Sequence, residues 1–296
     1  MYFDGMYGLG DNIYQRAVVR ALPGINYLRT PWPQLYADLP NIRCVRPATR
    51  LRTQAKNAAR AWNWATPPAS LAPRKADYVR HPGTMLEGLC AAYGVSLPAV
   101  TFDLPVCGAP CIPGEYIVGA PRKYVVIRPA TVRAEWRADA RNPDTQALYA
   151  AALAARRAGY MVVSVADLQE GHEWLDGEPP PAQFVWHKGE LSVEMLLGLV
   201  AGASAVIGGV GWMVPAAIAY KRPMLLLHGG WGAANGPHRI FDSRMDISRI
   251  HQVFPDNYCQ CRDARHACDK HISNLDEILA KFFAGIAHEQ PSDVVA

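Results

Sequence analysis

The sequence predicts an α/β protein made of two doubly wound parallel sheets that face each other across a cleft. Short strand-like segments alternate with helix-like ones, a segment rich in proline and glycine interrupts the alternation once, and the strands after it are almost entirely apolar. Strands that alternate with helices pair in parallel through right-handed crossovers. Apolar strands suit a sheet that helices cover on both faces.

The first 104 residues carry the first alternation. A helix is expected over 84–95, because Thr84 is a good N-cap and Gly94 a good helix end. The other expected helices are 11–22 and 51–62, and the expected strands are 1–6, 25–29, 41–47, 76–80 and 99–105.

The interruption "LPVCGAPCIPGEYIVGAPRK" has too many prolines and glycines for a helix or a central strand. We therefore expect an N-terminal domain over 1–104, a linker over 105–122 and a C-terminal domain over 123–296. The ligand site of such a protein lies at the carboxyl ends of the strands, in the cleft between the domains.

The second alternation is stronger than the first. Asn142 and Pro143 suit the start of an Ala-rich helix that runs through Arg157. Further helices are expected over 191–203, 212–221 and 274–289, strands over 123–130, 160–166, 182–187, 204–209 and 222–230, and a frayed tail over 290–296.

Composition limits the class of protein. The 296 residues are 50% hydrophobic and 19% charged, which is typical of a soluble globular chain. We find no apolar run long enough to span a bilayer and no signal peptide, so a cytoplasmic protein without stable membrane insertion is expected. The net charge of +4 is compatible with anionic ligands but does not by itself indicate nucleic-acid binding.

The turn Gly8-Leu9-Gly10 precedes Asp11 near the start of the first expected helix. Ile13 occupies the place of the third glycine of a dinucleotide fingerprint, which argues against a nicotinamide enzyme. The turn brings backbone amides and a carboxylate to the cleft. Alternatively, Asp11 only stabilises the helix through its dipole.

A glycine run follows the strand expected over 204–209. Such a run lets backbone approach a ligand closely, and the free amides at a helix start can bind a diphosphate. The alternative is tight packing between helix and sheet. The candidate diphosphate-binding residues here are Gly208, Gly209, Val210, Gly211, Trp212 and Met213.

Arg128, Thr131 and Arg133 follow the end of another strand. Arginine can bind phosphate oxygens bidentately and stays charged, although a solvated basic loop is the alternative. Glu170 and Glu173 follow the next strand and could accept hydrogen bonds from sugar hydroxyls, or could be surface charges.

The seven cysteines are expected to be mostly reduced thiols. Cys259, Cys261, Cys268 and His271 cluster in sequence, but Cys-x-Cys is a less common zinc spacing than Cys-x-x-Cys. A structural zinc site is one interpretation, and a C-terminal loop with incidental thiols is the one favoured from the sequence. No metal ligands are therefore predicted.

Three segments in this order resemble the heptosyltransferase-like family of glycosyltransferases. They are "GLGDNIYQRAVVRAL", "HPGTMLEGLCAAYGV" and "SVEMLLGLVAGASAVIGG" with the following "PAAIAYKRPMLLLHGG". The resemblance implies the glycosyltransferase-B fold, with two Rossmann-like domains. The chain departs from the family at Val210-Gly211-Trp212, where an Asp-Ser/Thr-Gly triplet is usual, at Pro215, where a histidine is usual, and near Trp136, where a lysine is missing.

The resemblance implies a metal-independent, inverting hexosyl- or heptosyltransferase that uses a nucleotide-diphosphate sugar and no cofactor. Asp11 would be the general base. The donor would be bound by the glycine run together with Gly8, Gly10, Arg128, Thr131, Arg133 and Glu170. The acceptor hydroxyl is not identified, with a glycan preferred to DNA. The alternatives are a nucleotide-sugar-binding module without catalysis, and a transferase acting on modified DNA, which the basic stretch from Arg43 to Arg60 suggests.

Overall fold

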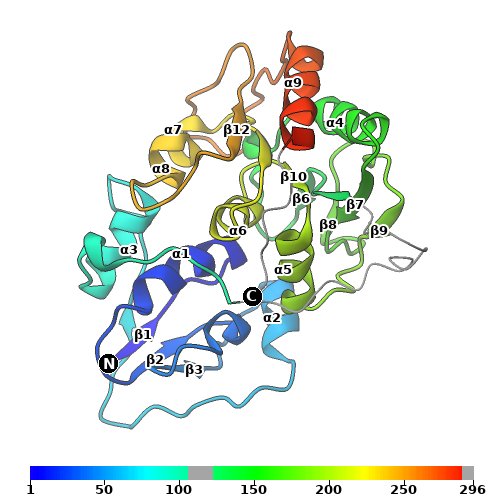
Figure 1. Ribbon diagram of the computed structural model, residues 1–296. Coiled ribbons are helices and arrows are strands. Elements are labelled where there is room, and N and C mark those ends of the chain that lie inside the picture. The colour runs from blue at the N-terminus through cyan, green and yellow to red at the C-terminus, as the bar shows by residue number, and fades with distance from the viewer. Residues whose placement is uncertain (106–122, 289–296) are drawn as a thin grey trace. The chain divides into compact units, whose positions relative to one another are not determined.

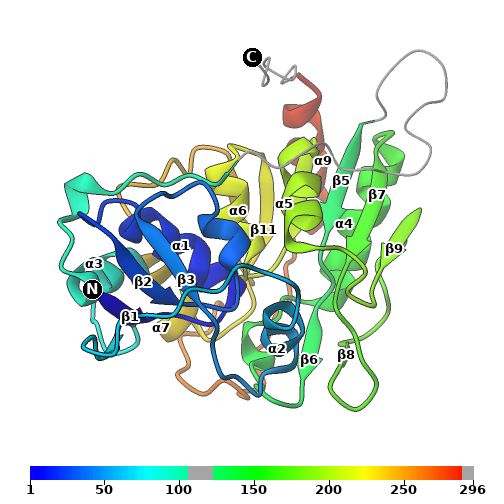
Figure 2. The ribbon, with the colours of Figure 1, turned by 90° about the horizontal axis from the view of Figure 1, so that it is seen from below.

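The computed structural model describes residues 1–105 and 123–288 (Figures 1 and 2). The chain divides into two compact units, one of Met1–Val106 with Pro237–Ile247 and one of Cys107–Gly236 with Ser248–Ala296. Each unit contains a parallel sheet, as the alternation of strands and helices predicts. The predicted linker, 105–122, lies outside the described residues apart from Pro105.

The sheet of the first unit has four parallel strands in the order β3-β2-β1-β4. Tyr2 pairs with Tyr27 in the register of β1 and β2. The strands are β1 (Tyr2–Asp4), β2 (Asn26–Arg29), β3 (Ile42–Val45) and β4 (Arg74–Lys75). The helices are α1 (Leu9–Val19), η1 (Pro33–Tyr36), α2 (Arg52–Ala58), α3 (Met85–Tyr93), η2 (Leu97–Ala99) and α8 (Pro237–Ile240).

The ends of α3 confirm the helix expected there. Thr84 and Glu87 form a reciprocal capping box, in which each side chain accepts the backbone N–H of the other residue. Gly94 ends the helix with a φ of 71°, a left-handed conformation that glycine adopts without strain.

Two predicted strands of this unit are wrong. The strand expected over 99–105 is absent. Its carbonyl groups accept hydrogen bonds from arginine side chains and not from the backbone of a neighbouring strand. Arg16 Nε donates to Asp103 O at 3.2 Å and Arg244 Nη2 donates to Val100 O at 3.0 Å. The strand expected over 76–80 lies earlier in the chain, as the two-residue β4.

Arg16 is the buried cation of the first unit, with 1% of its side chain exposed. It donates to both carboxylate oxygens of Asp38, at 2.7 and 2.8 Å, and to Leu35 O at 2.5 Å. These hydrogen bonds hold the pKa of the Asp38 carboxyl below its usual range. The pair thus links α1 to the segment that follows η1.

Replacing Asp38 by asparagine should lower the free energy of unfolding of this unit by about 2 kcal/mol at neutral pH, because buried Arg16 loses a charged partner. Asp38 has a lowered pKa in the folded state, so its contribution is present above its unfolded pKa and is lost as pH falls through the folded value. The deficit should therefore shrink below about pH 4 in urea-unfolding curves. Asp77→Asn is the matched control, because Asp77 forms an ion pair with the exposed Lys75. This substitution should lower the free energy of unfolding by under about 1 kcal/mol. An equal loss in both variants would contradict a special role for Arg16.

The sheet of the second unit has six parallel strands in the order β12-β11-β10-β5-β7-β9. These are β5 (Tyr124–Ile127), β7 (Met161–Val165), β9 (Phe184–Trp186), β10 (Ala205–Gly208), β11 (Met224–Leu227) and β12 (Ile250–Val253). The helices are η3 (Asp139–Arg141), α4 (Thr145–Arg157), α5 (Val193–Gly202), α6 (Met213–Ala219), α7 (Gly232–Asn235) and α9 (Leu275–His288). β12 was not predicted.

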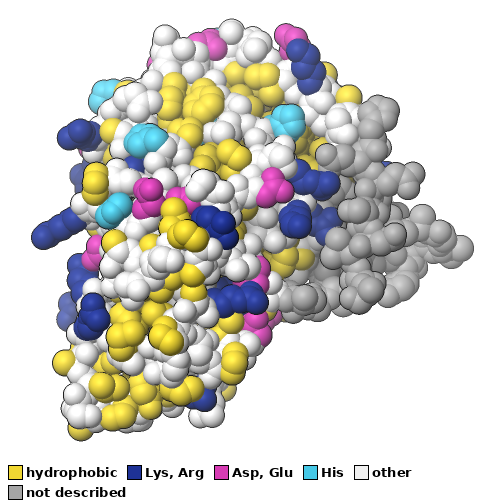
Figure 3. Space-filling model, turned by 60° about the vertical axis from the view of Figure 1, so that its left-hand side comes forward, with side chains coloured by type: hydrophobic (Ala, Val, Ile, Leu, Met, Phe, Trp, Pro, Cys, Tyr) yellow, Lys and Arg dark blue, Asp and Glu magenta, His cyan; other side chains and the backbone are white. Residues whose placement is uncertain are grey.

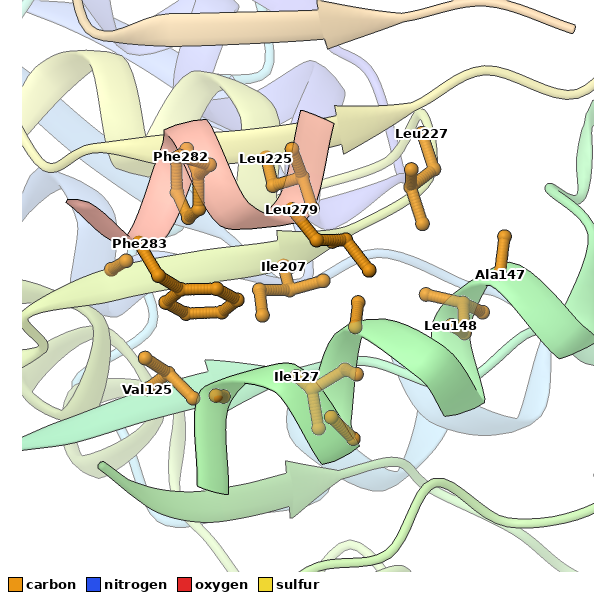
Figure 4. Packing of buried hydrophobic residues seen from close by; sticks show 14 of the residues in the cluster. Val125, Ile127, Ala147, Leu148, Ile207, Leu225, Leu227, Leu279, Phe282 and Phe283 are labelled. Carbon is orange, nitrogen blue, oxygen red and sulfur yellow. The ribbon is translucent and has the colours of Figure 1, made fainter. Parts of the chain in front are cut away.

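The core of this unit lies on one face of the sheet, beneath α4 and α9 (Figure 4). Ile127, Ile207 and Leu225 point toward these helices. The alternate residues Val126 and Val206 are also fully buried, and they point to the other face. Both faces are therefore covered, which confirms the doubly wound class for this sheet.

A separate antiparallel ribbon joins β6 (Thr131–Arg133) to β8 (Glu173–Leu175), and it was not predicted either. In its register Arg133 lies opposite Glu173. Among the described helices, none has the length and apolarity needed to cross a membrane.

Candidate functional site

The first group of predicted residues lies at the start of α1. Gly8 is the N-cap residue, and its carbonyl accepts the backbone N–H of Asn12 at 3.0 Å and Asn12 Nδ2 at 2.8 Å. A Cβ at Gly8 would collide with the carboxylate of Asp11, so glycine lets that carboxylate fold back over the turn. Gly10 and Asp11 lie in the first helical turn, because α1 begins at Leu9, earlier than predicted.

Asp11 is partly exposed and has a tyrosine partner that the sequence analysis missed. Tyr78 Oη donates to Asp11 Oδ1 at 2.7 Å. A carboxylate in the first turn is stabilised by the helix dipole. Its position at the surface of the unit leaves it able to act as a general base toward a hydroxyl within hydrogen-bond reach.

A buried network of polar side chains holds the turn in place. Asn12 Oδ1 accepts from Tyr36 Oη at 2.8 Å, and Gln15 Oε1 accepts from Tyr93 Oη at 2.8 Å and from the backbone N–H of Met6 at 2.7 Å. Such a satisfied network is rigid, because breaking any bond would leave a buried polar atom unpaired. It therefore holds the backbone that presents Asp11.

A pocket in the second unit collects several of the predicted donor-binding residues. It lies at the carboxyl ends of β5 and β10, where a doubly wound sheet binds its ligand. It is lined by Arg128, Pro129, Ala130, Thr131, Arg133, Trp136, Ala138, Arg141, Asn142, Pro143, Gly209 and Val210.

Glu173, a buried carboxylate, organises the polar side of this pocket. Only 2% of its side chain is exposed, and it lies 2.9 Å from Arg133 Nε and 3.5 Å from Arg128 Nη2. Thr131 Oγ1 donates to Glu173 Oε1 at 2.8 Å. One carboxylate thus orients two guanidinium groups and a hydroxyl.

The surroundings of Arg128 disfavour the charged form of its guanidinium. Burial and the neighbouring charge of Arg133 lower the pKa of Arg128 to about 10, against the opposing effect of Glu173. A third cation, Arg141, stacks on the half-exposed ring of Trp136, with its Cζ 5.2 Å from the ring centroid. An anion bound in the pocket would offset the crowding of these cations.

The structure separates the other predicted residues into two groups. Gly209 and Val210 line the pocket, and a Cβ at Gly209 would lie 2.7 Å from Pro143 Cδ, so the close approach requires glycine. Glu170 is exposed and is not among the pocket-lining residues, and Glu173 is the acid that contacts the arginines. The rest of the glycine run is also outside the lining: Gly208, Gly211, Trp212 and Met213.

Met213 is 2% exposed, and a Cβ added at Gly208 would lie 3.8 Å from its sulfur. The backbone N–H of Val214 donates to Gly211 O at 3.2 Å. That amide in the first turn of α6 is therefore already used within the chain.

Three cysteines and a histidine meet in the loop before α9. Cys259, Cys261, His266 and Cys268 each offer a ligand atom, and these atoms all lie within 4.8 Å of one another. The histidine is His266, whereas His271, which clusters with the cysteines in sequence, is exposed outside this group. The four atoms thus converge in a loop for which the sequence favoured incidental thiols.

The spacing of these atoms fits a tetrahedral metal site. Cys261 Sγ lies 3.6 Å from Cys268 Sγ, and His266 Nδ1 lies 3.3 Å from Cys268 Sγ and 3.6 Å from Cys259 Sγ. Ligands bonded at zinc–sulfur and zinc–nitrogen lengths are separated by about 3.5–3.8 Å. The backbone N–H of Trp231 donates to Cys261 Sγ at 3.2 Å, a contact that stabilises a metal-bound thiolate.

One face of the molecule is shown in Figure 3. Lys and Arg side chains form separate small groups there, with acidic and hydrophobic side chains between them.

Two units that each contain a parallel sheet, one with an arginine-lined pocket at its strand ends, define an α/β fold of the glycosyltransferase-B class. No protein-family model matches the sequence, and no curated protein is significantly similar to it. The solved structures, in contrast, include matches over almost the whole chain.

One is the dodecameric iron-containing heptosyltransferase TibC of enterotoxigenic E. coli, in complex with ADP-D-β-D-heptose. It has a TM-score of 0.59 and 16% identity, with 97% of this chain and 77% of that one covered. The E. coli ADP-heptose lps heptosyltransferase II has a TM-score of 0.55 and 14% identity, covering 95% and 98%. A family 9 glycosyl transferase of Veillonella parvula has a TM-score of 0.57 and 11% identity, covering 96% and 97%. The chain is thus similar in fold to the heptosyltransferases, which confirms the predicted fold class and resemblance.

Proposed function

We propose that the protein is a glycosyltransferase that moves a sugar from a nucleotide-diphosphate sugar to an acceptor hydroxyl, with inversion at the anomeric carbon. The observation that carries the proposal is the arginine-lined pocket at the strand ends of the second unit, in a chain with the heptosyltransferase fold. The E. coli neighbours that act with ADP-heptose support a donor of this general kind.

The pocket would bind the diphosphate of the donor. Arg128 and Arg133 supply positive charge, and the backbone at Gly209–Val210 lies close to the same space. Negative charge grows on the diphosphate as it leaves, and fixed cations stabilise that charge in the transition state. The arginines therefore do the work that a divalent cation does at other nucleotide-sugar sites, and the sequence contains no Asp-x-Asp motif.

Asp11 would take the proton from the acceptor hydroxyl. In an inverting transfer the oxygen attacks the anomeric carbon from the side opposite the diphosphate, and one carboxylate near that oxygen suffices. Tyr78 and the network below the turn would keep the carboxylate in place. We propose a glycan hydroxyl as the acceptor.

The reaction itself tests this proposal. Nucleotide sugars should release their nucleoside diphosphate in buffer without added Mg²⁺ or Mn²⁺, faster with a glycan acceptor than without one, and the product should have the opposite anomeric configuration by NMR. Binding without any turnover across a panel of acceptors would instead indicate a nucleotide-sugar-binding module. Transfer with retained configuration would contradict the inverting mechanism.

We also propose that Cys259, Cys261, His266 and Cys268 hold one metal ion, apart from the transfer step. Three thiolates and an imidazole suit zinc or iron, and the fold neighbour TibC is described as iron-containing. The ion would order a loop that has neither helix nor strand over 259–268. Metal analysis of the purified protein should find about one zinc or iron ion per chain, and Cys259→Ser should lower that content.

A further inference from the structure

Two adjacent glycines at the end of β11 separate the pocket from the cysteine cluster. A Cβ at Gly229 would collide with the carbonyl oxygen of Asn142 and would lie 2.6 Å from that of Arg141. A Cβ at Gly230 would collide with the sulfur of Cys268. The pocket wall and a candidate metal ligand therefore pack against consecutive residues of the same backbone.

Backbone hydrogen bonds join the same two regions directly. The N–H of Ala140 donates to Ala264 O at 2.9 Å, and Ala264 belongs to the loop that carries the four ligands. The carbonyl of Ala140 accepts from the N–H of Gly230 at 2.6 Å. Both polar groups of Ala140, next to Arg141 in the pocket lining, are thus held by Gly230 and by the cysteine loop.

A hydrogen bond from a lysine side chain adds to this link. Lys270 Nζ donates to Asp139 O at 2.9 Å, from just beyond the loop to the first residue of η3. The segment 138–142 is therefore joined by hydrogen bonds to the cysteine loop, to Lys270 two residues beyond it and to Gly230 after β11.

We propose that the metal-bound loop is a positioning element of the donor pocket: the ion holds Ala264 against Ala140 and so fixes Arg141 at the pocket. This inference rests on the proposed donor site and metal site. The loop 259–268 contains no regular secondary structure, so an ion bound to its four ligands would add to the hydrogen bonds that hold it. Loss of the ion frees the loop, releases Ala140 and lets the wall with Arg141 move.

Hydrogen exchange of the holoprotein and of the same protein after metal removal tests the link without relying on activity. Peptides covering 138–142 should exchange faster once the metal is removed, because the Ala140 N–H loses its acceptor. Peptides covering β5, whose amides belong to the central sheet, should not change. ADP, UDP, GDP and CDP then serve as probes by calorimetry, and the nucleotide that binds should bind about tenfold more weakly to the metal-free protein.

Variants separate the two sides of the link. Cys259→Ser should reduce metal content, speed exchange over 138–142 and weaken nucleotide binding. Gly229→Ala should keep the metal and still weaken binding, because it displaces the wall directly. Cys90→Ser, at a buried cysteine of the first unit, is the matched control and should change neither metal content nor binding.

The outcomes distinguish the positioning role of the loop from the proposed donor site and the proposed metal site. Metal loss that leaves exchange over 138–142 and nucleotide affinity unchanged would overturn the positioning role, as would a protein that takes up neither zinc nor iron. If no nucleotide binds to the holoprotein, the donor site fails, while faster exchange over 138–142 on metal removal would still support the link between loop and wall.

Discussion

Replacing Asp11 by asparagine is expected to lower kcat for sugar transfer by about a thousandfold while leaving the Kd for the donor nearly unchanged. Asparagine keeps the size of the side chain and can still pair with Tyr78, but it cannot take a proton. The loss should therefore appear in the chemical step. Steady-state kinetics with the preferred donor, combined with calorimetry of donor binding, measures both quantities.

Asp4→Asn is the matched control for this variant. Asp4 is a partly exposed carboxylate at the end of β1, paired with Arg29 at 3.5 Å and close in sequence to the same turn. Its replacement should leave kcat within about twofold, because it has no part in proton transfer. A kcat for Asp11→Asn close to that of the wild type would remove Asp11 as the base.

Replacing Arg128 by methionine should raise the Kd for the bound nucleoside diphosphate by about a hundredfold. Methionine fills a similar volume but carries no charge, so the diphosphate loses a charge-assisted hydrogen bond in a partly buried site. Glu173 keeps Arg133 and Thr131 as partners, so the ribbon of β6 and β8 should stay folded. Calorimetry with the nucleoside diphosphate is the measurement.

Arg137→Met is the control, because Arg137 pairs with Asp139 near the pocket but is not among its lining residues. Its effect on Kd should be under about twofold, in line with an exposed ion pair. Equal effects of the two substitutions would mean that the general charge of the region, rather than the pocket, attracts the nucleotide. A salt titration of both variants separates these cases.

Local patterns in the sequence predicted those parts of the fold that depend on neighbouring residues. Thr84 and Gly94 are the N-cap and the helix end of α3, as predicted, because caps depend on a few adjacent residues, whereas the part of Glu87 in the capping box was not predicted. The apolar strands of the second unit were found for the same reason. The expected strand over 99–105 failed because its carbonyl groups are bound by Arg16 and Arg244, which lie far away in sequence.

The candidate site was predicted less well, because it depends on pairings between distant segments. Glu173 rather than the nearby Glu170 contacts the arginines, since the register of β6 and β8 places it opposite Arg133. Nothing in the spacing of the two glutamates indicates that register. Likewise the path of the loop, not its sequence spacing, brings His266 rather than His271 to the three cysteines.

A thermal-shift screen against ADP-, UDP-, GDP- and CDP-linked sugars, without added divalent metal, tests the central claim most directly. A ligand at about 100 times its Kd stabilises the protein by roughly 2.7 kcal/mol, which is a measurable rise in Tm. The account predicts such a rise with one nucleotide class, and its loss in Arg128→Met. No rise with any of the four, from a folded protein, would contradict a nucleotide-sugar site in this pocket.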